Sequence, residues 1–157
     1  GQFADLHLVR SNPIARLGEG PAVIAVAGPD SYISPDWYGM EDQVPTWNYV
    51  AVHLRGVLEA RPADEIEDFV TRLSDAFEAR LAPKPVWTVS KMDRGGLERM
   101  LRMILPFRLN IERIDGTWKL NQNKPDDARM RAADHVAETG IGSEASALSD
   151  LMRRRKP

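Results

Sequence analysis

The sequence contains no cysteine and only three histidines, His7, His53 and His135. Without cysteine, disulfides, thiolate nucleophiles and cysteine-ligated metals are excluded, and this absence fits a cytoplasmic location. The histidines are far apart in the sequence and have no carboxylate pattern beside them, so we expect no metal site. No arrangement of serine, histidine and aspartate stands out, and we therefore assign no catalytic residue.

The sequence also lacks long apolar runs and a large excess of charge of one sign. No run approaches the ~18 apolar residues of a membrane span, so we expect no membrane partner. The N-terminus has neither the basic start nor the apolar run of a signal peptide. A net charge of -2 gives no general attraction to DNA. Contact with DNA would depend on the basic cluster Arg153-Arg154-Arg155-Lys156, which is more simply explained as a solvated helix end.

A length of 157 residues fits a single domain. Strands are predicted at residues 3–9, 21–27, 44–59 and 107–114, and helices at 13–17, 62–81, 93–105, 126–138 and 143–154. The apolar run at 21–27 predicts a buried strand, and the Gly- and Pro-rich stretch at 28–43 predicts a loop. That loop holds several aromatic residues, which indicates that it either covers one end of the fold or binds something.

Capping residues and prolines set several of these boundaries. Asn12 and Asp93 are suited to cap the helices that follow them. Pro106 is expected to stop the helix at 93–105. Apolar residues at helical spacing within 62–81 predict a core-facing stripe, which consists of Ile66, Phe69, Val70, Leu73 and Phe77.

Asp115-Gly116 lies between two alternating segments and predicts a tight β-hairpin. Folding the chain there would form favourable cross-strand pairs, namely Ile114–Thr117, Arg113–Trp118, Glu112–Lys119 and Ile111–Leu120. Lys119 would then lead into a polar strip, Asn121-Gln122-Asn123. Amides can read the edge of a heterocycle, but the same strip is also consistent with a polar strand end and a helix cap at Asn123.

The longest strand pattern is Val44 to Gly56. One of its faces carries Trp47, Tyr49, Ala51, His53 and Arg55, and the other becomes apolar from Val50 onward and should point at a core. A row of rings and basic groups can line a partner surface or a planar ligand, or it can be an ordinary half-solvated sheet face. His53 is most simply a residue of that face.

Four segments of the sequence resemble the PaiB family, the FMN-binding negative transcriptional regulators of bacteria. They are His7-Leu8-Val9-Arg10-Ser11-Asn12-Pro13, Tyr32-Ile33-Ser34-Pro35-Asp36-Trp37-Tyr38, Val44 to His53 with its Val-Pro-Thr-Trp-Asn-Tyr run, and Ile111 to Pro125. The segments occur in the order of the family and span most of the chain.

The resemblance implies an α+β fold with a mainly β core, an FMN-binding split β-barrel that is mostly antiparallel, with outer helices and a helical C-terminal extension at 125–157. It implies FMN as cofactor and a homodimer as the assembly. The residues expected to meet the flavin are Trp47, Asn48, Tyr49, His53, Trp118, Lys119, Gln122, Asn123 and Lys124. DNA is a partner only through the regulatory role of the family.

Members of the family usually carry further barrel strands ahead of the segment that begins at His7, where this sequence has six residues. We therefore expect a single domain over 1–157 that lacks those strands and part of the flavin site. Two alternatives remain, a flavin-dependent oxidoreductase of the same barrel type and an interaction module whose flavin site has decayed. Flavin itself carries hydride chemistry, so an enzyme of this kind would need few catalytic side chains.

Overall fold

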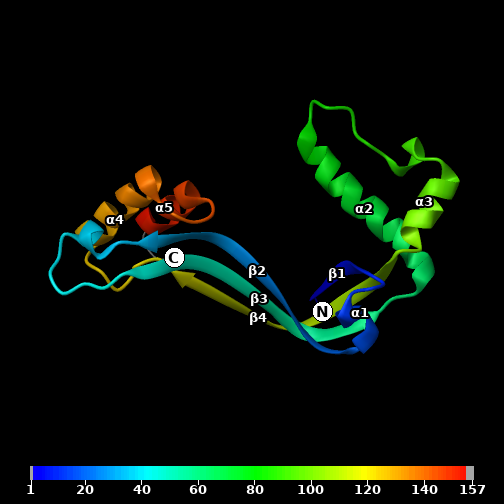
Figure 1. Cartoon of the computed structure of the whole chain (residues 1–157), viewed down its shortest axis with the longest axis horizontal. Coiled ribbons are helices and arrows are strands. Elements are labelled where there is room, and N and C mark those ends of the chain that lie inside the picture. Colours follow the sequence, from blue (N-terminus) through cyan, green and yellow to red (C-terminus); the bar gives the residue numbers. More distant parts are fainter. Residues whose placement is uncertain (1, 155–157) are drawn as a thin grey trace. The chain divides into compact units, whose positions relative to one another are not determined.

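The computed structural model describes residues 2–154 (Figure 1). An antiparallel sheet has the strand order β1-β4-β3-β2 and consists of β1 (Gln2–Val9), β2 (Gly20–Ile33), β3 (Thr46–Ala60) and β4 (Ile104–Lys119). The α-helices are α1 (Pro13–Leu17), α2 (Ile66–Glu78), α3 (Arg94–Leu101), α4 (Asp126–Thr139) and α5 (Ala145–Arg153). The expected α+β fold with an antiparallel β core is confirmed. No helix in the described range is long and apolar enough to cross a membrane.

The chain divides into two compact units, and β2, β3 and β4 contribute to both. The first unit comprises the described residues up to Val23 together with Arg55–Arg113. The second comprises Ile24–Leu54 together with the described residues from Ile114 onward.

The first unit is organised by β1, which pairs antiparallel with β4 from Gln2 opposite Ile111 to Val9 opposite Ile104. The predicted caps are confirmed, because the side chain of Asn12 accepts a hydrogen bond from Ile14 N and that of Asp93 accepts one from Gly96 N. These bonds satisfy amides that a helix start otherwise leaves unpaired.

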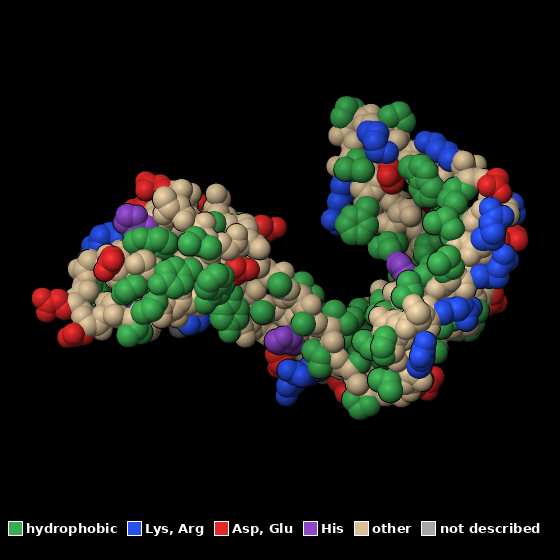
Figure 2. Space-filling model, in the orientation of Figure 1, with side chains coloured by type: hydrophobic (Ala, Val, Ile, Leu, Met, Phe, Trp, Pro, Cys, Tyr) green, Lys and Arg blue, Asp and Glu red, His purple; other side chains and the backbone are tan. Residues whose placement is uncertain are grey.

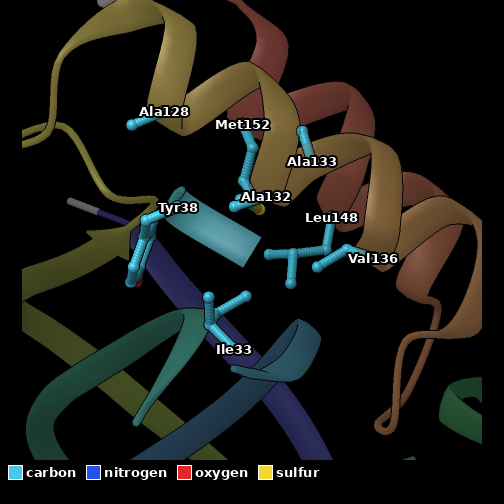
Figure 3. Packing of buried hydrophobic residues seen from close by; sticks show 8 residues of the cluster. All are labelled: Ile33, Tyr38, Ala128, Ala132, Ala133, Val136, Leu148 and Met152. Atoms are coloured by element: carbon cyan, nitrogen blue, oxygen red, sulfur yellow. The ribbon is translucent and has the colours of Figure 1, made fainter. Parts of the chain in front are cut away.

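The second unit has a core where α4 and α5 pack on Ile33 and Tyr38 (Figure 3). Tyr38 ends the short 3-10 helix η1 (Pro35–Tyr38). Alanines on α4 allow the close approach, and Leu148 and Met152 of α5 fill the remaining space. The helices therefore bury one face of this part of the sheet. The basic cluster predicted at the end of the chain begins on α5 with Arg153, and its residues 155 and 156 lie outside the described range.

The predicted hairpin at Asp115-Gly116 is wrong, because β4 runs unbroken through both residues. Gly116 is not among the residues with positive φ, so it does not form the turn that its position suggested. Long-range pairing replaces the predicted local pairing, since β4 lies between β1 and β3 in the sheet. Among the described residues, β1 is paired with β4 only as far as Ile111, so β3 is the neighbour that remains beyond that residue. Ile111, for example, is opposite Gln2 and not opposite Leu120.

Other boundaries also differ from the predictions. The first six residues of the predicted loop at 28–43 belong to β2, and the run at 21–27 is a strand that is largely exposed and not buried. α3 ends at Leu101, and Pro106 lies buried within β4 opposite His7 instead of stopping a helix. The apolar stripe of α2 is buried only at its start, because Phe77 is 56% exposed.

Candidate functional site

All nine residues predicted to meet a flavin lie in the second unit. They fall on β3, at the end of β4, and in the turn that joins β4 to α4. Figure 2 shows hydrophobic side chains gathered over the strands of this unit. The structure thus brings together segments that are about seventy residues apart in the sequence.

Side chains alternate between the two faces of a strand, and β3 shows this clearly. Trp47 and Tyr49 are 42% and 36% exposed, whereas Asn48 between them is fully buried. The ring of Tyr32 on β2 meets Trp47 edge to face, with centroids 6.2 Å apart. By the same alternation His53 lies on the face of Trp47 and Tyr49. We call the surface made by Tyr32, Trp47, Tyr49, His53 and Trp118 the aromatic face.

Trp118 is assigned to the aromatic face through its neighbour on β4. Lys119 Nζ donates to Thr46 Oγ1 at 2.6 Å, and Thr46 shares the face of the buried Asn48. Because successive side chains point to opposite sides of a sheet, Trp118 lies on the face of Trp47. It is 51% exposed. The predicted set therefore divides, with Lys119 and Asn48 on the face opposite to the exposed rings.

Asn48 is held in the core and not at the surface. Its Nδ2 is 3.5 Å from Met152 Sδ on α5, a weak hydrogen bond. Its Oδ1 has no hydrogen-bond partner among the described residues, although it is buried. A buried acceptor without a partner is costly. Asn48 is thus a core residue that links β3 to α5, and it is not available at the surface.

The turn after β4 is closed by Gln122. Its Nε2 donates to Trp118 O at 2.5 Å, and its Oε1 accepts from Leu120 N at 2.7 Å. Gln122 therefore uses its amide to hold the end of the strand, while Asn123 beside it is exposed. Lys124 is half-buried, donates to Gln43 Oε1, and lies 4.9 Å from the ring centroid of Tyr38.

Sequence reasoning did not predict the structural roles of three residues in this region. Tyr38 and Asn121 are buried and bonded to each other, and Gly116 leaves room for the indole of Trp118. The spacing Gly116-x-Trp118 carries a usable signal, since residues two apart in a strand share a face. The pairing of Tyr38 with Asn121 has no local signal, because 83 positions separate them.

A cleft of about 480 Å³ lies elsewhere, in the first unit, and no predicted site residue lines it. Its charged groups largely neutralise one another. Arg94 bonds Glu67 at 2.7 Å and Glu98 at 2.8 Å, so its guanidinium is already paired. In the described range no group of three or more acidic, histidine or cysteine side chains could hold a metal ion.

The arrangement in the second unit suits a flat apolar ligand. Exposed rings on one sheet face offer stacking area, and the hydroxyls of Tyr32 and Tyr49 and the imidazole of His53 add polar contacts. The antiparallel sheet with its outer helices is a split-barrel α+β fold. A solved structure shares the fold, the FAD and heme binding protein from Mycobacterium smegmatis, with a TM-score of 0.52 and 20% identity.

The chain belongs to the family described as "Putative FMN-binding domain", which matches residues 2–113. It is 30% identical over 148 residues to the Protease synthase and sporulation protein PAI 2 of Bacillus subtilis, covering 93% of this chain and 70% of that protein. The resemblance to PaiB proteins is therefore confirmed. The comparison with the mycobacterial structure covers 91% of this chain, which spans only 63% of that protein. Trp118 to Lys124 lie beyond the residues matched by the family.

Proposed function

We propose that this chain binds FMN, with the isoalloxazine ring on the aromatic face. The observation that carries the proposal is the exposure of Trp47, Tyr49 and Trp118 on one face of the sheet in the second unit. Rings of this size are normally buried, and an exposed group of them indicates a binding surface. Membership of an FMN-binding family supports FMN as the planar ligand.

The residues present fit the ring of FMN better than its phosphate. Trp47, Tyr49 and Trp118 would stack on the ring, and His53 would lie beside it. Lys119 points to the other face of the sheet and bonds Thr46, so it is not placed to meet a phosphate beside the rings. Lys124 is the remaining predicted cation near the turn. When bound, FMN would supply hydride and electron-transfer chemistry.

The test is the flavin absorbance spectrum of the purified protein, followed by titration with FMN under fluorescence quenching. Trp118→Ala removes stacking area and is expected to weaken binding by about tenfold or more. Val44→Ala is a matched control, because Val44 is 73% exposed and lies outside the aromatic face. Val44→Ala should bind FMN as tightly as the wild type. If Trp118→Ala does so too, the flavin lies elsewhere.

A titration with riboflavin separates the ring from the phosphate. Riboflavin lacks the phosphate, so equal affinities for riboflavin and FMN would show that this chain holds only the ring. Tighter binding of FMN that is lost in Lys124→Met would assign the phosphate contact to Lys124. The same change should leave riboflavin binding unaltered.

A homodimer is part of the proposal, because it would cover the exposed rings. A two-fold assembly buries the same patch on both copies. Light scattering at micromolar concentration should give twice the monomer mass, and Trp47→Glu should shift the protein toward monomer. A monomer at all concentrations would contradict this assembly.

The regulatory role is proposed from the relative named as a protease synthase and sporulation protein. A regulator would bind operator DNA, whereas an oxidoreductase would reduce its flavin with a nicotinamide cofactor. Both assays should be run on the flavin-loaded protein. Flavin reduction without DNA binding would favour the oxidoreductase, and absence of flavin binding would favour an interaction module.

A further inference from the structure

Tyr38 is buried in the second unit, where η1, the turn after β4 and α4 meet. It is 1% exposed, and its hydroxyl donates to Asn121 Oδ1 at 3.1 Å. Burial raises the pKa of Tyr38, so the hydroxyl stays protonated at neutral pH and remains a donor. The bond is shielded from water, since Asn121 is only 4% exposed.

The backbone conformation of Asn121 determines the direction of the turn after β4. Its φ of 61° is left-handed, a conformation that non-glycine residues adopt uncommonly. The turn returns the side chain of Gln122 to the end of β4, where it bonds Trp118 O and Leu120 N. Asn121 O also accepts from Lys124 N at 3.0 Å. The conformation of Asn121 is therefore linked to both Trp118 and Lys124.

Tyr38 also contacts the turn with its ring and is itself held in place. Lys124 Nζ lies 4.9 Å from the ring centroid, within cation–π range. The carbonyl oxygen of Tyr38 accepts from Arg131 Nε at 3.1 Å and from Arg131 Nη2 at 2.5 Å. Arg131 lies on α4, so the helix anchors Tyr38 while Tyr38 anchors the turn.

We propose that Tyr38 is a positioning residue for the flavin site. Through its hydrogen bond to Asn121, Tyr38 holds Trp118 and Lys124 in place. This inference rests on the proposed function. Tyr38 is buried and does not itself contact the ligand. Its hydroxyl fixes the left-handed turn, and the turn fixes the end of β4 that carries the exposed indole.

Tyr38→Phe removes only the hydroxyl and keeps the ring in the core. Asn121 would lose its only side-chain partner in the described structure, since its Nδ2 is already unpaired. We expect FMN binding to weaken by roughly threefold to tenfold. The indole N–H signal of Trp118 should also shift in the NMR spectrum of the flavin-free protein, where Trp118→Phe identifies it.

Ser149→Ala is the matched control. Ser149 is 1% exposed and donates to Ala133 O at 2.7 Å, so this variant also loses one buried hydroxyl of the same unit. The melting temperature of Ser149→Ala should fall, as that of Tyr38→Phe should, because each loses a buried hydroxyl. The FMN affinity and the Trp118 signal of Ser149→Ala should stay unchanged. Equal effects of the two variants on affinity and on the Trp118 signal would reduce Tyr38 to a stability role and overturn the proposal.

Asn121→Gly tests the route of the effect. Glycine adopts the left-handed conformation easily but offers no acceptor to Tyr38. It should weaken FMN binding as Tyr38→Phe does, and the double variant should be no weaker than either single one. Additive losses would overturn the proposed route. If the wild type binds no FMN, the proposed function fails, and the Trp118 signal still decides whether Tyr38 positions that residue.

Discussion

The indole of Trp118 occupies the space that a side chain at Gly116 would fill. A Cβ added to Gly116 would lie 2.1 Å from Cζ3 and 2.5 Å from Cη2 of Trp118. Gly116, which suggested a hairpin, therefore makes room for Trp118, the next residue on the same face of β4. Its absent side chain is what lets the indole lie against the strand.

Gly116→Ala is accordingly expected to displace the indole of Trp118 while the protein stays folded. The backbone of Gly116 is extended, and the clash is with a side chain that can move outward. The indole of Trp118 should become more accessible, so acrylamide should quench the tryptophan fluorescence more strongly. FMN binding should weaken by about threefold or more. Unaltered quenching and unaltered affinity would show that the position of this indole is unimportant.

Gly56→Ala should be much more damaging than Gly116→Ala, although both change a glycine in a strand. A Cβ at Gly56 would lie 1.9 Å from the carbonyl oxygen of Asn110, a backbone atom of the neighbouring strand. That atom cannot move without disturbing the sheet. We expect a loss of roughly 1–3 kcal/mol or more in the free energy of unfolding. Urea unfolding of the two variants measures the difference, and equal losses would contradict this account.

The ion pair between Asp5 and Arg108 should make the stability depend on pH in the acid range. Arg108 Nε and Nη2 donate to Asp5 at 2.6 and 3.0 Å, and this holds the pKa of Asp5 below its ordinary value of 3.8. Because the folded pKa is the lower one, the stabilisation is complete above pH 3.8 and is lost as the pH falls through the folded pKa.

Asp5→Asn should therefore lower the melting temperature at pH 7 and have a smaller effect at pH 2. The pair is largely buried, with the side chains of Asp5 and Arg108 14% and 26% exposed. A hydrogen bond to a charged group contributes about 1.5–3 kcal/mol. Glu98→Gln is the control, since its pair with Arg94 is exposed, does not involve Asp5 and should contribute little. The same loss at both pH values would contradict the assignment.

Any DNA binding should be weak, sensitive to salt, and carried by the basic cluster from Arg153 to Lys156. Arg153 pairs with Asp134 at 2.6 Å, so part of this charge is already neutralised. Each phosphate contact contributes a slope of about -0.9 to log K against log salt concentration. Replacing the four cations by serine should flatten that slope in fluorescence anisotropy titrations. Specific binding that survives the replacement would place the recognition surface elsewhere.

Local chemistry in the sequence was sufficient for much of the fold. Asn12 and Asp93 cap their helices because a short polar side chain just before a helix can accept a hydrogen bond from a backbone N–H of the first turn. The alternation from Thr46 to Leu58 predicted the strand and its buried side, since a period of two needs no tertiary information. The rings of Trp47 and Tyr49 were correctly expected on the face opposite to the core.

Only the tertiary structure decided the course of β4 and the organisation of the turn after it. Asp115-Gly116 has the chemistry of a hairpin, but the strand continues through both residues beside β3, so its place in the sheet outweighs the local preference. Lys119 has a residue type suited to a flavin, yet its contact with Thr46 on the neighbouring strand places it on the face opposite to the exposed rings. The contact of Tyr38 with Asn121 joins residues 83 positions apart, so it exists only once the second unit has packed.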